Sequence, residues 1–121
     1  MAYVTGSQLR LYNTKTGENK LLYEEKNHML LQNLSFSCDK QWIGFNRNED
    51  VDALPDRGPN YACFKEKMFA TKDGRVSVIR LDGSEFHDVF RDTHWLSHFQ
   101  FSPDNPDIAM FCCLLYTSDA A

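Results

Sequence analysis

The amino-acid sequence predicts an all-β protein, a β-propeller fragment of about two to two and a half four-stranded antiparallel blades. Three observations lead to this fold class. Short apolar segments with period-2 alternation recur along the chain, between turn clusters rich in Gly, Asn, Asp and Ser. Two of these segments repeat each other, and helical periodicity is nearly absent.

The first strands are expected at Tyr3–Val4, Gln8–Tyr12 and Lys20–Glu24. A Thr-Gly-Ser cluster separates the first two, and residues 13–18 form the next turn, in which Gly17 can take a positive φ. Apolar and polar residues alternate in the second segment, as in a strand with one buried face. Lys20–Glu24 is expected to return as an outer strand.

The next pair of strands is expected at Met29–Ser37 and Gln41–Asn46, joined by a turn at residues 38–40. After an insertion, the same plan is expected to repeat from Gly74, with a strand that includes Val76 and Val78 and a hairpin turn at residues 82–85. The remaining strands are expected at residues 88–90, His98–Phe101 and Ile108–Cys112.

An internal repeat supports this arrangement. Residues 28–40 (HMLLQNLSFSCDK) and 94–105 (HWLSHFQFSPDN) share a leading His, a Leu and a Phe-Ser-x-Asp ending. Aligned on the Phe-Ser pair, the two copies place Asn33 opposite His98. Without the insertion the period is about 40 residues, the length of a four-stranded blade. We therefore expect the copies to be the inner strands of successive blades.

The insertion, residues 46–71, is predicted to be a loop at the rim of the propeller. It is polar and carries two prolines and a glycine within residues 55–59, which prevents long regular structure. A calcium loop is not expected, because Val51 and Arg57 occupy the positions where an EF-hand needs Gly and Glu. Only residues 61–70 could form a helical turn or two.

The propeller is expected to span residues 1–112. Residues 113–121 (CLLYTSDAA) depart from the strand pattern and resemble the translation of a transposon-end sequencing adapter, so they are excluded from fold reasoning. The chain also begins directly in strand-like sequence. We therefore expect a fragment truncated at both ends.

Composition argues against several partners. The formal charge of −4 disfavours nucleic acid and anionic membrane surfaces. No apolar run approaches the roughly 20 residues of a membrane span, and no signal peptide is recognisable. The four cysteines are Cys38, Cys63, Cys112 and Cys113, and their spacing matches no metal-binding motif. They are expected to be buried, reduced thiols of a cytoplasmic protein.

His98 is the main candidate for chemistry. Nucleotide-binding motifs and a GxSxG nucleophile motif are missing. His98 lies on an expected inner strand, whose ends surround the central channel where propellers place ligands, and imidazole titrates near neutral pH. A hydrogen-bonded structural histidine is the alternative, and Asn33 at the equivalent position shows that a blade does not require imidazole there.

Residues 74–112 resemble the oligogalacturonate lyases, seven-bladed propeller enzymes of bacterial pectin breakdown. Trp95–His98 (WLSH) is similar to the family's W-L-G-H strand, with Ser97 in place of a glycine. Residues 109–112 (AMFC) are similar to the start of its A-F-C-H-E-G-P segment. The resemblance is looser over residues 3–46.

The resemblance implies a lyase that cleaves short, often unsaturated, oligogalacturonates by β-elimination. The family's catalytic base falls on His98, and Arg75 or, less directly, Lys72 would bind the substrate carboxylate. A manganese ion assists in the family, and its ligands would lie beyond residue 112, so the fragment alone is expected to bind no metal and to be inactive.

Two other functions remain open from the sequence. One is a non-enzymatic binding scaffold of the TolB or WD40-like kind, because the Phe-Ser-Pro-Asp turn occurs in all these propellers. The other is the propeller domain of a prolyl-oligopeptidase-like serine peptidase. A downstream H-E-G-P and Q-x-x-H-x-H would favour the lyase, and a downstream G-x-S-x-G would favour the peptidase.

Overall fold

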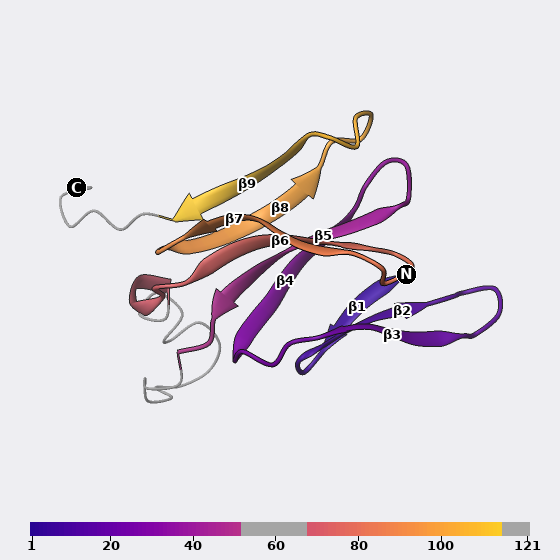
Figure 1. Cartoon of the computed structure of the whole chain (residues 1–121), viewed down its shortest axis with the longest axis horizontal. Coiled ribbons are helices and arrows are strands. Elements are labelled where there is room, and N and C mark those ends of the chain that lie inside the picture. The colour runs from indigo at the N-terminus through magenta and orange to yellow at the C-terminus, as the bar shows by residue number, and fades with distance from the viewer. Residues whose placement is uncertain (52–67, 115–121) are drawn as a thin grey trace.

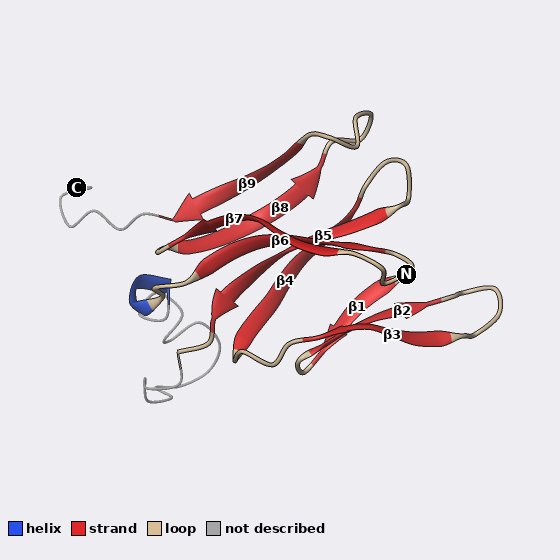
Figure 2. Cartoon of the chain, viewed as in Figure 1, coloured by secondary structure: helices blue, strands red, loops and turns tan. Residues whose placement is uncertain are grey.

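A computed structural model describes residues 1–51 and 68–114 of the chain. Within this part, the backbone forms antiparallel strands in three sheets, and a single helical turn occurs at residues 68–70 (Figures 1 and 2). The strands are β1 (Ala2–Thr5), β2 (Gln8–Tyr12), β3 (Asn19–Glu24), β4 (Met29–Phe36), β5 (Trp42–Glu49), β6 (Gly74–Arg80), β7 (Phe86–Asp92), β8 (Trp95–Phe101) and β9 (Ala109–Leu114).

The three sheets follow the order of the chain. β1–β2–β3 form the first sheet, β4–β5–β6–β7 the second, and β8–β9 the third, with every pairing antiparallel. The second sheet is a complete four-stranded meander, the blade of a propeller. β8 packs against β4 and β5, and β1 contacts β4, so neighbouring sheets meet face to face (Figure 1). The predicted all-β propeller fragment is therefore confirmed.

A separate apolar core fills each inter-sheet contact. Between the first two sheets, Tyr23 of β3 stacks on Phe86 of β7 with ring centroids 4.7 Å apart. The buried residues of this core are Leu9, Leu31, Ile43, Phe45 and Ile79. Between the second and third sheets the buried residues are Val76, Leu96 and Phe99. Burial of apolar area at these two contacts supplies the main driving force for stacking the sheets.

The predicted start of the insertion at Asn46 is wrong by several residues. β5 continues to Glu49 and remains paired with β4 and β6 through Asn48. The polar sequence here predicts a loop, but the polar side chains are buried and hydrogen-bonded to residues of the neighbouring sheets or next to them. Residues 52–67 lie outside the described residues, so of the predicted helical segment at 61–70 only residues 68–70 are described.

The third sheet extends into the segment expected to be an adapter. β9 pairs with β8 through Cys113 and Leu114, while residues 115–121 lie outside the described residues. The described cysteines are free. The prediction of burial is wrong for Cys112 and Cys113, which are exposed, and Cys38 is only half-buried. No helix among the described residues is long and apolar enough to cross a membrane.

Candidate active site at the β8 bulge

His98 lies in a β-bulge that the second sheet repeats. The β8–β9 register shifts between Ser97 and Gln100, so two residues of β8 oppose one residue of β9. The β4–β5 register shifts in the same way between Gln32 and Ser35. The sequence repeat therefore corresponds to a repeated structural feature.

Both bulges place a non-glycine residue in the left-handed region. His98 has a φ of 58° and Asn33, its counterpart in the repeat, has a φ of 57°. Asn and His tolerate this region better than most residues, but it still costs on the order of 1–3 kcal/mol. Ser97, which stands where the resembled family has glycine, is not among the positive-φ residues, so the serine fits its backbone without strain.

Side chains of the second sheet hold the bulge in place. The backbone amide of His98 donates to Oδ1 of Asn33 at 3.0 Å, and the amide of Phe99 donates to Oδ1 of Asn46 at 3.1 Å. Neither β8 residue has a partner in the β9 register. The amides of the two bulge residues are thus accepted by side chains of β4 and β5.

The strand on both sides of the bulge is anchored in the same manner. The buried Asn48 side chain donates to the carbonyl of Leu96 at 2.7 Å and accepts its amide at 2.9 Å. At the other end, Ser35 Oγ accepts the amide of Phe101 at 3.0 Å. The backbone of β8 is therefore fixed along its length by four polar side chains of the preceding sheet.

The imidazole of His98, in contrast with its backbone, is open to solvent. The residue is exposed, and Nδ1 lies 2.9 Å from Oγ of Ser97. Which of these two atoms donates depends on the tautomer, and a hydrogen bond at Nδ1 orients the ring. An accessible imidazole on a backbone held in this way can accept a proton from a molecule bound beside it.

Arg75, a predicted carboxylate-binding residue, is bound to two aspartates. Its guanidinium donates two 3.0 Å hydrogen bonds to Asp73 and one to Asp88, also at 3.0 Å. These carboxylates raise the pKa of Arg75 above its ordinary value, despite partial burial. Because side chains alternate along β5 and β6, Arg75 faces the first sheet with Arg47, while Asn46 and Asn48 face β8.

The structure therefore does not bring Arg75 to His98. Lys72, the other predicted carboxylate-binding residue, is exposed just before β6, and its backbone amide donates to Oε1 of Glu49 at 3.0 Å. No contact between Lys72 and His98 is found among the described residues. The predicted site residues are thus placed separately: His98 on the third sheet, Arg75 and Lys72 on or beside the second.

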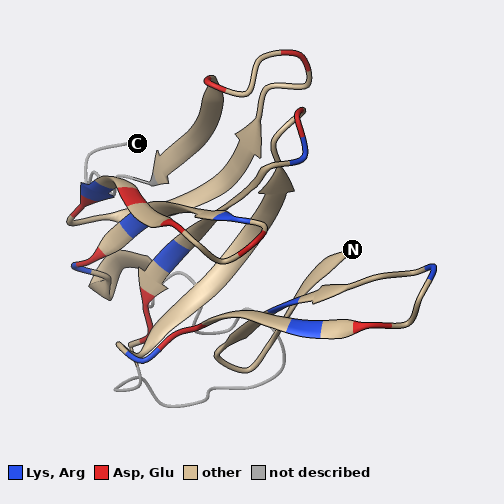
Figure 3. Cartoon of the chain, turned by 45° about the vertical axis from the view of Figure 1, so that its right-hand side comes forward, with Lys and Arg blue, Asp and Glu red and all other residues tan. Residues whose placement is uncertain are grey.

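A buried charge network links the first two sheets, and sequence reasoning missed it. Arg47 donates to both carboxylate oxygens of Glu25, at 2.7 and 3.1 Å, and to Asp88 at 2.8 Å. The side chains of Arg47 and Glu25 are only 2% and 1% exposed. Acidic and basic positions are close together on these strands (Figure 3). The network was missed because Glu25 and Arg47 are 22 residues apart in sequence.

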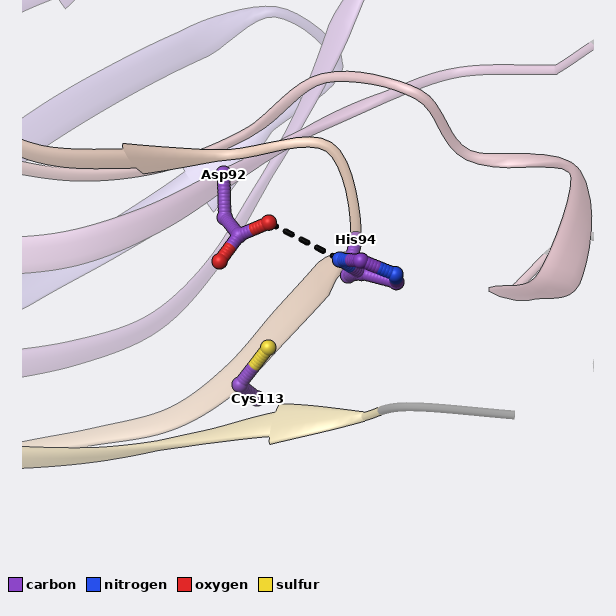
Figure 4. Close-up of side chains that lie close together, drawn as sticks. All are labelled: Asp92, His94 and Cys113. Carbon is purple, nitrogen blue, oxygen red and sulfur yellow. Dashed lines mark hydrogen bonds and ion pairs between the residues drawn. The ribbon is translucent and has the colours of Figure 1, made fainter. Parts of the chain in front are cut away.

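Another cluster contains three potential metal ligands. Asp92 Oδ1 lies 2.8 Å from Nδ1 of His94, and the thiol of Cys113 is close to both (Figure 4). The ligand atoms lie within 4.8 Å of one another. Manganese prefers carboxylate, carbonyl and water ligands, and a soft thiolate does not fit it. Cys113 also belongs to the segment expected to be an adapter, so no functional site is assigned to this cluster.

Comparison with known proteins identifies a shared fold. No protein-family model matches the chain, and no curated protein is significantly similar to it. Two solved structures are similar over 93% of the chain: an oligogalacturonate lyase in complex with manganese (TM-score 0.76, 20% identity) and an oligogalacturonate lyase from Vibrio parahaemolyticus (TM-score 0.77, 18% identity). The chain spans 30% of the length of each. It therefore has the fold of part of an oligogalacturonate lyase.

Proposed function

We propose that this chain is part of an oligogalacturonate lyase and that His98 is the general base of a β-elimination. The proposal is carried by one observation: His98 exposes its imidazole from a bulge whose backbone is fixed by side chains of the preceding sheet. The sequence resemblance around His98 and the similarity to two lyase structures add support from independent comparisons.

The reaction needs one proton acceptor on this chain. The neutral imidazole of His98 takes the proton from C5 of a uronate, next to the carboxylate. A C4–C5 double bond forms as the bond from C4 to the glycosidic oxygen breaks, and the leaving oxygen gains a proton from solvent. The products are a 4,5-unsaturated uronate, which rearranges to a deoxy-ketouronate, and a shortened oligogalacturonate.

The uronate carboxylate must be neutralised while negative charge develops at C5. Arg75 and Lys72 are the proposed partners. Arg75 is already paired with Asp73 and Asp88, so binding substrate would require it to leave these carboxylates. Lys72 is exposed, and binding the substrate would not require it to leave such an ion pair. These contacts favour Lys72 for the substrate and a structural role for Arg75.

Manganese is proposed only for a longer parent protein, with ligands outside residues 1–112. One of the similar lyase structures contains manganese. In the described part of this chain, the one cluster of metal-ligating side chains includes a cysteine, whose soft sulfur does not suit that ion. No step of the proposed reaction on this chain is therefore assigned to a metal.

The free cysteines agree with the cytoplasmic location that we propose for the parent.

The test uses the protein expressed from the intact gene, supplied with manganese and digalacturonate. We expect formation of the ketouronate product, with no turnover of a neutral digalactoside, because the C5 proton is acidic only next to a carboxylate. His98→Ala should reduce turnover at least about 100-fold. His87→Ala, an exposed histidine on β7, is the control and should keep full activity. An inactive wild-type protein, or an active His98→Ala variant, would overturn the proposal.

A further inference from the structure

We propose that Asn33 and Asn46 are positioning residues for His98. By accepting the amides of His98 and Phe99, they hold the β8 bulge in the conformation that presents the imidazole. The catalytic part of this inference rests on the proposed function. The part that concerns the backbone of His98 does not.

The first argument is the hydrogen-bonding of the bulge itself. Ser97 and Gln100 pair with β9, and the two residues between them do not share in this register. Their amides are accepted by Asn33 and Asn46 of the second sheet, at 3.0 and 3.1 Å. A left-handed residue persists only where surrounding contacts fix it. These two side chains supply the direct contacts to the bulged backbone.

The second argument is the burial of Asn46. Its side chain is fully buried, and its Nδ2 group has no hydrogen-bond partner among the described residues. A buried amide with an unmatched donor is unfavourable, and an apolar residue of similar size would avoid that penalty. Asparagine differs from leucine at this position in that its Oδ1 accepts the hydrogen bond from the amide of Phe99.

The third argument is the equivalence of Asn33 and His98. Both are exposed and both occupy the left-handed position of a bulge, one in the second sheet and one in the third. In the second sheet this position supplies the acceptor that reaches the next sheet. In the third sheet it carries an imidazole whose Nδ1 lies near Ser97. The same backbone feature thus provides an inter-sheet tie in one blade and the candidate base in the next.

Two variants of Asn33 separate the acceptor from the backbone preference. Asn33→Gly accepts the φ of 57° but has no side-chain acceptor. Asn33→Asp keeps an Oδ acceptor and also tolerates the left-handed region. Ser35→Ala is the matched control, because it removes the bond to Phe101 beyond the bulge. Asn33→Ser, whose hydroxyl is too short to replace the amide oxygen, repeats the test if the glycine variant loses its near-UV CD spectrum.

Two readouts are used. NMR of the 121-residue chain follows the φ-sensitive couplings of His98 and the imidazole ¹⁵N shifts, which report the contact with Ser97. Steady-state kinetics of the intact protein give kcat and KM. For Asn33→Gly we expect His98 couplings that no longer indicate a single left-handed conformation, and a kcat reduced about tenfold with KM within about twofold. Asn33→Asp and Ser35→Ala should resemble wild type.

Wild-type His98 couplings and kcat in Asn33→Gly would overturn the inference, as would equal losses in Asn33→Gly and Ser35→Ala. An intact wild-type protein without lyase activity would overturn the proposed function instead. In that case the NMR measurement still decides whether Asn33 fixes the backbone of His98.

Discussion

The backbone amide of His98 donates a 3.0 Å hydrogen bond to the side chain of Asn33, and both residues have the same left-handed φ. The two residues occupy equivalent places in successive sheets, so this bond joins one bulge to the next. A position that is strained in both of these sheets is the one at which this chain places its candidate base. Stability and function therefore make different demands on residue 98.

Substitutions at residue 98 should show this difference. Glycine takes a φ of 58° without steric strain, whereas alanine retains the strain and loses the ring contact. We expect His98→Gly to be more stable than His98→Ala by about 1 kcal/mol in the free energy of unfolding, measured by urea denaturation. Equal stabilities would argue against a left-handed backbone at this position.

Gly44 on β5 should tolerate no side chain. A Cβ at this position would overlap the ring of Phe99, which packs directly on the Gly44 backbone. Phe99 is 5% exposed and part of the core between the second and third sheets. We expect Gly44→Ala to reduce the free energy of unfolding by about 1–3 kcal/mol, because the ring must leave its packed position. Phe99→Leu in the same background should recover part of this loss, and no recovery would contradict the assigned cause.

Stability should fall in acid through the charge network. Burial opposes ionisation of Glu25, but hydrogen bonds from Arg47 and the amide of Asn27 lower its pKa below the ordinary value of 4.5. Burial likewise opposes ionisation of Asp88, and Ser77 and Arg47 lower its pKa below 3.8. A carboxyl with a lowered folded-state pKa stabilises the fold above its unfolded-state pKa.

That stabilisation should be complete above about pH 5 and should be lost as the pH falls through the lowered folded-state values. The measurement is the free energy of unfolding between pH 7 and pH 2. Glu25→Gln should lower the free energy of unfolding by about 3 kcal/mol at pH 7, because it leaves the buried Arg47 with fewer compensating charges. Its free energy of unfolding should also depend less steeply on pH in acid. An unchanged pH profile in Glu25→Gln would contradict the role of Glu25.

Arg75 and Lys72 should differ in what their removal changes. Arg75→Ala leaves Asp73 and Asp88 without their shared cation, so we expect a lower free energy of unfolding. Lys72→Ala removes an exposed cation, so we expect little loss of stability. If Lys72 neutralises the substrate carboxylate in the intact protein, its removal should lower kcat/KM several-fold. A fall in kcat/KM for Arg75→Ala at unchanged stability would restore Arg75 as the substrate partner.

The fold could largely be predicted from the sequence because propeller strands alternate visibly and repeat at blade length. The hairpin turns and the pairing of Asn33 with His98 followed from that pattern. The extent of β5 did not, because Asn46, Arg47 and Asn48 are polar, and only inter-sheet hydrogen bonds make their burial favourable. Sequence patterns within one strand carry no information about such partners.

The candidate site was only partly predictable for the same reason. His98 could be selected by its residue type and strand, but its positive φ arises from a register shift in the β8–β9 pairing. The contacts of Arg75 with Asp73 and Asp88 depend on which face of β6 it occupies. The side-chain oxygens of Asn33 and Asn46 accept amides of the next sheet, and these contacts exist only when the sheets are stacked.

The most direct test of the central claim is the lyase activity of His98→Asn in the protein from the intact gene. Asparagine is the residue that the preceding sheet uses at this position, so the bulge and the stability should be retained while the base is removed. We expect a wild-type near-UV CD spectrum and turnover of digalacturonate at least about 100-fold below wild type. A folded His98→Asn variant with wild-type turnover would show that His98 is not the base.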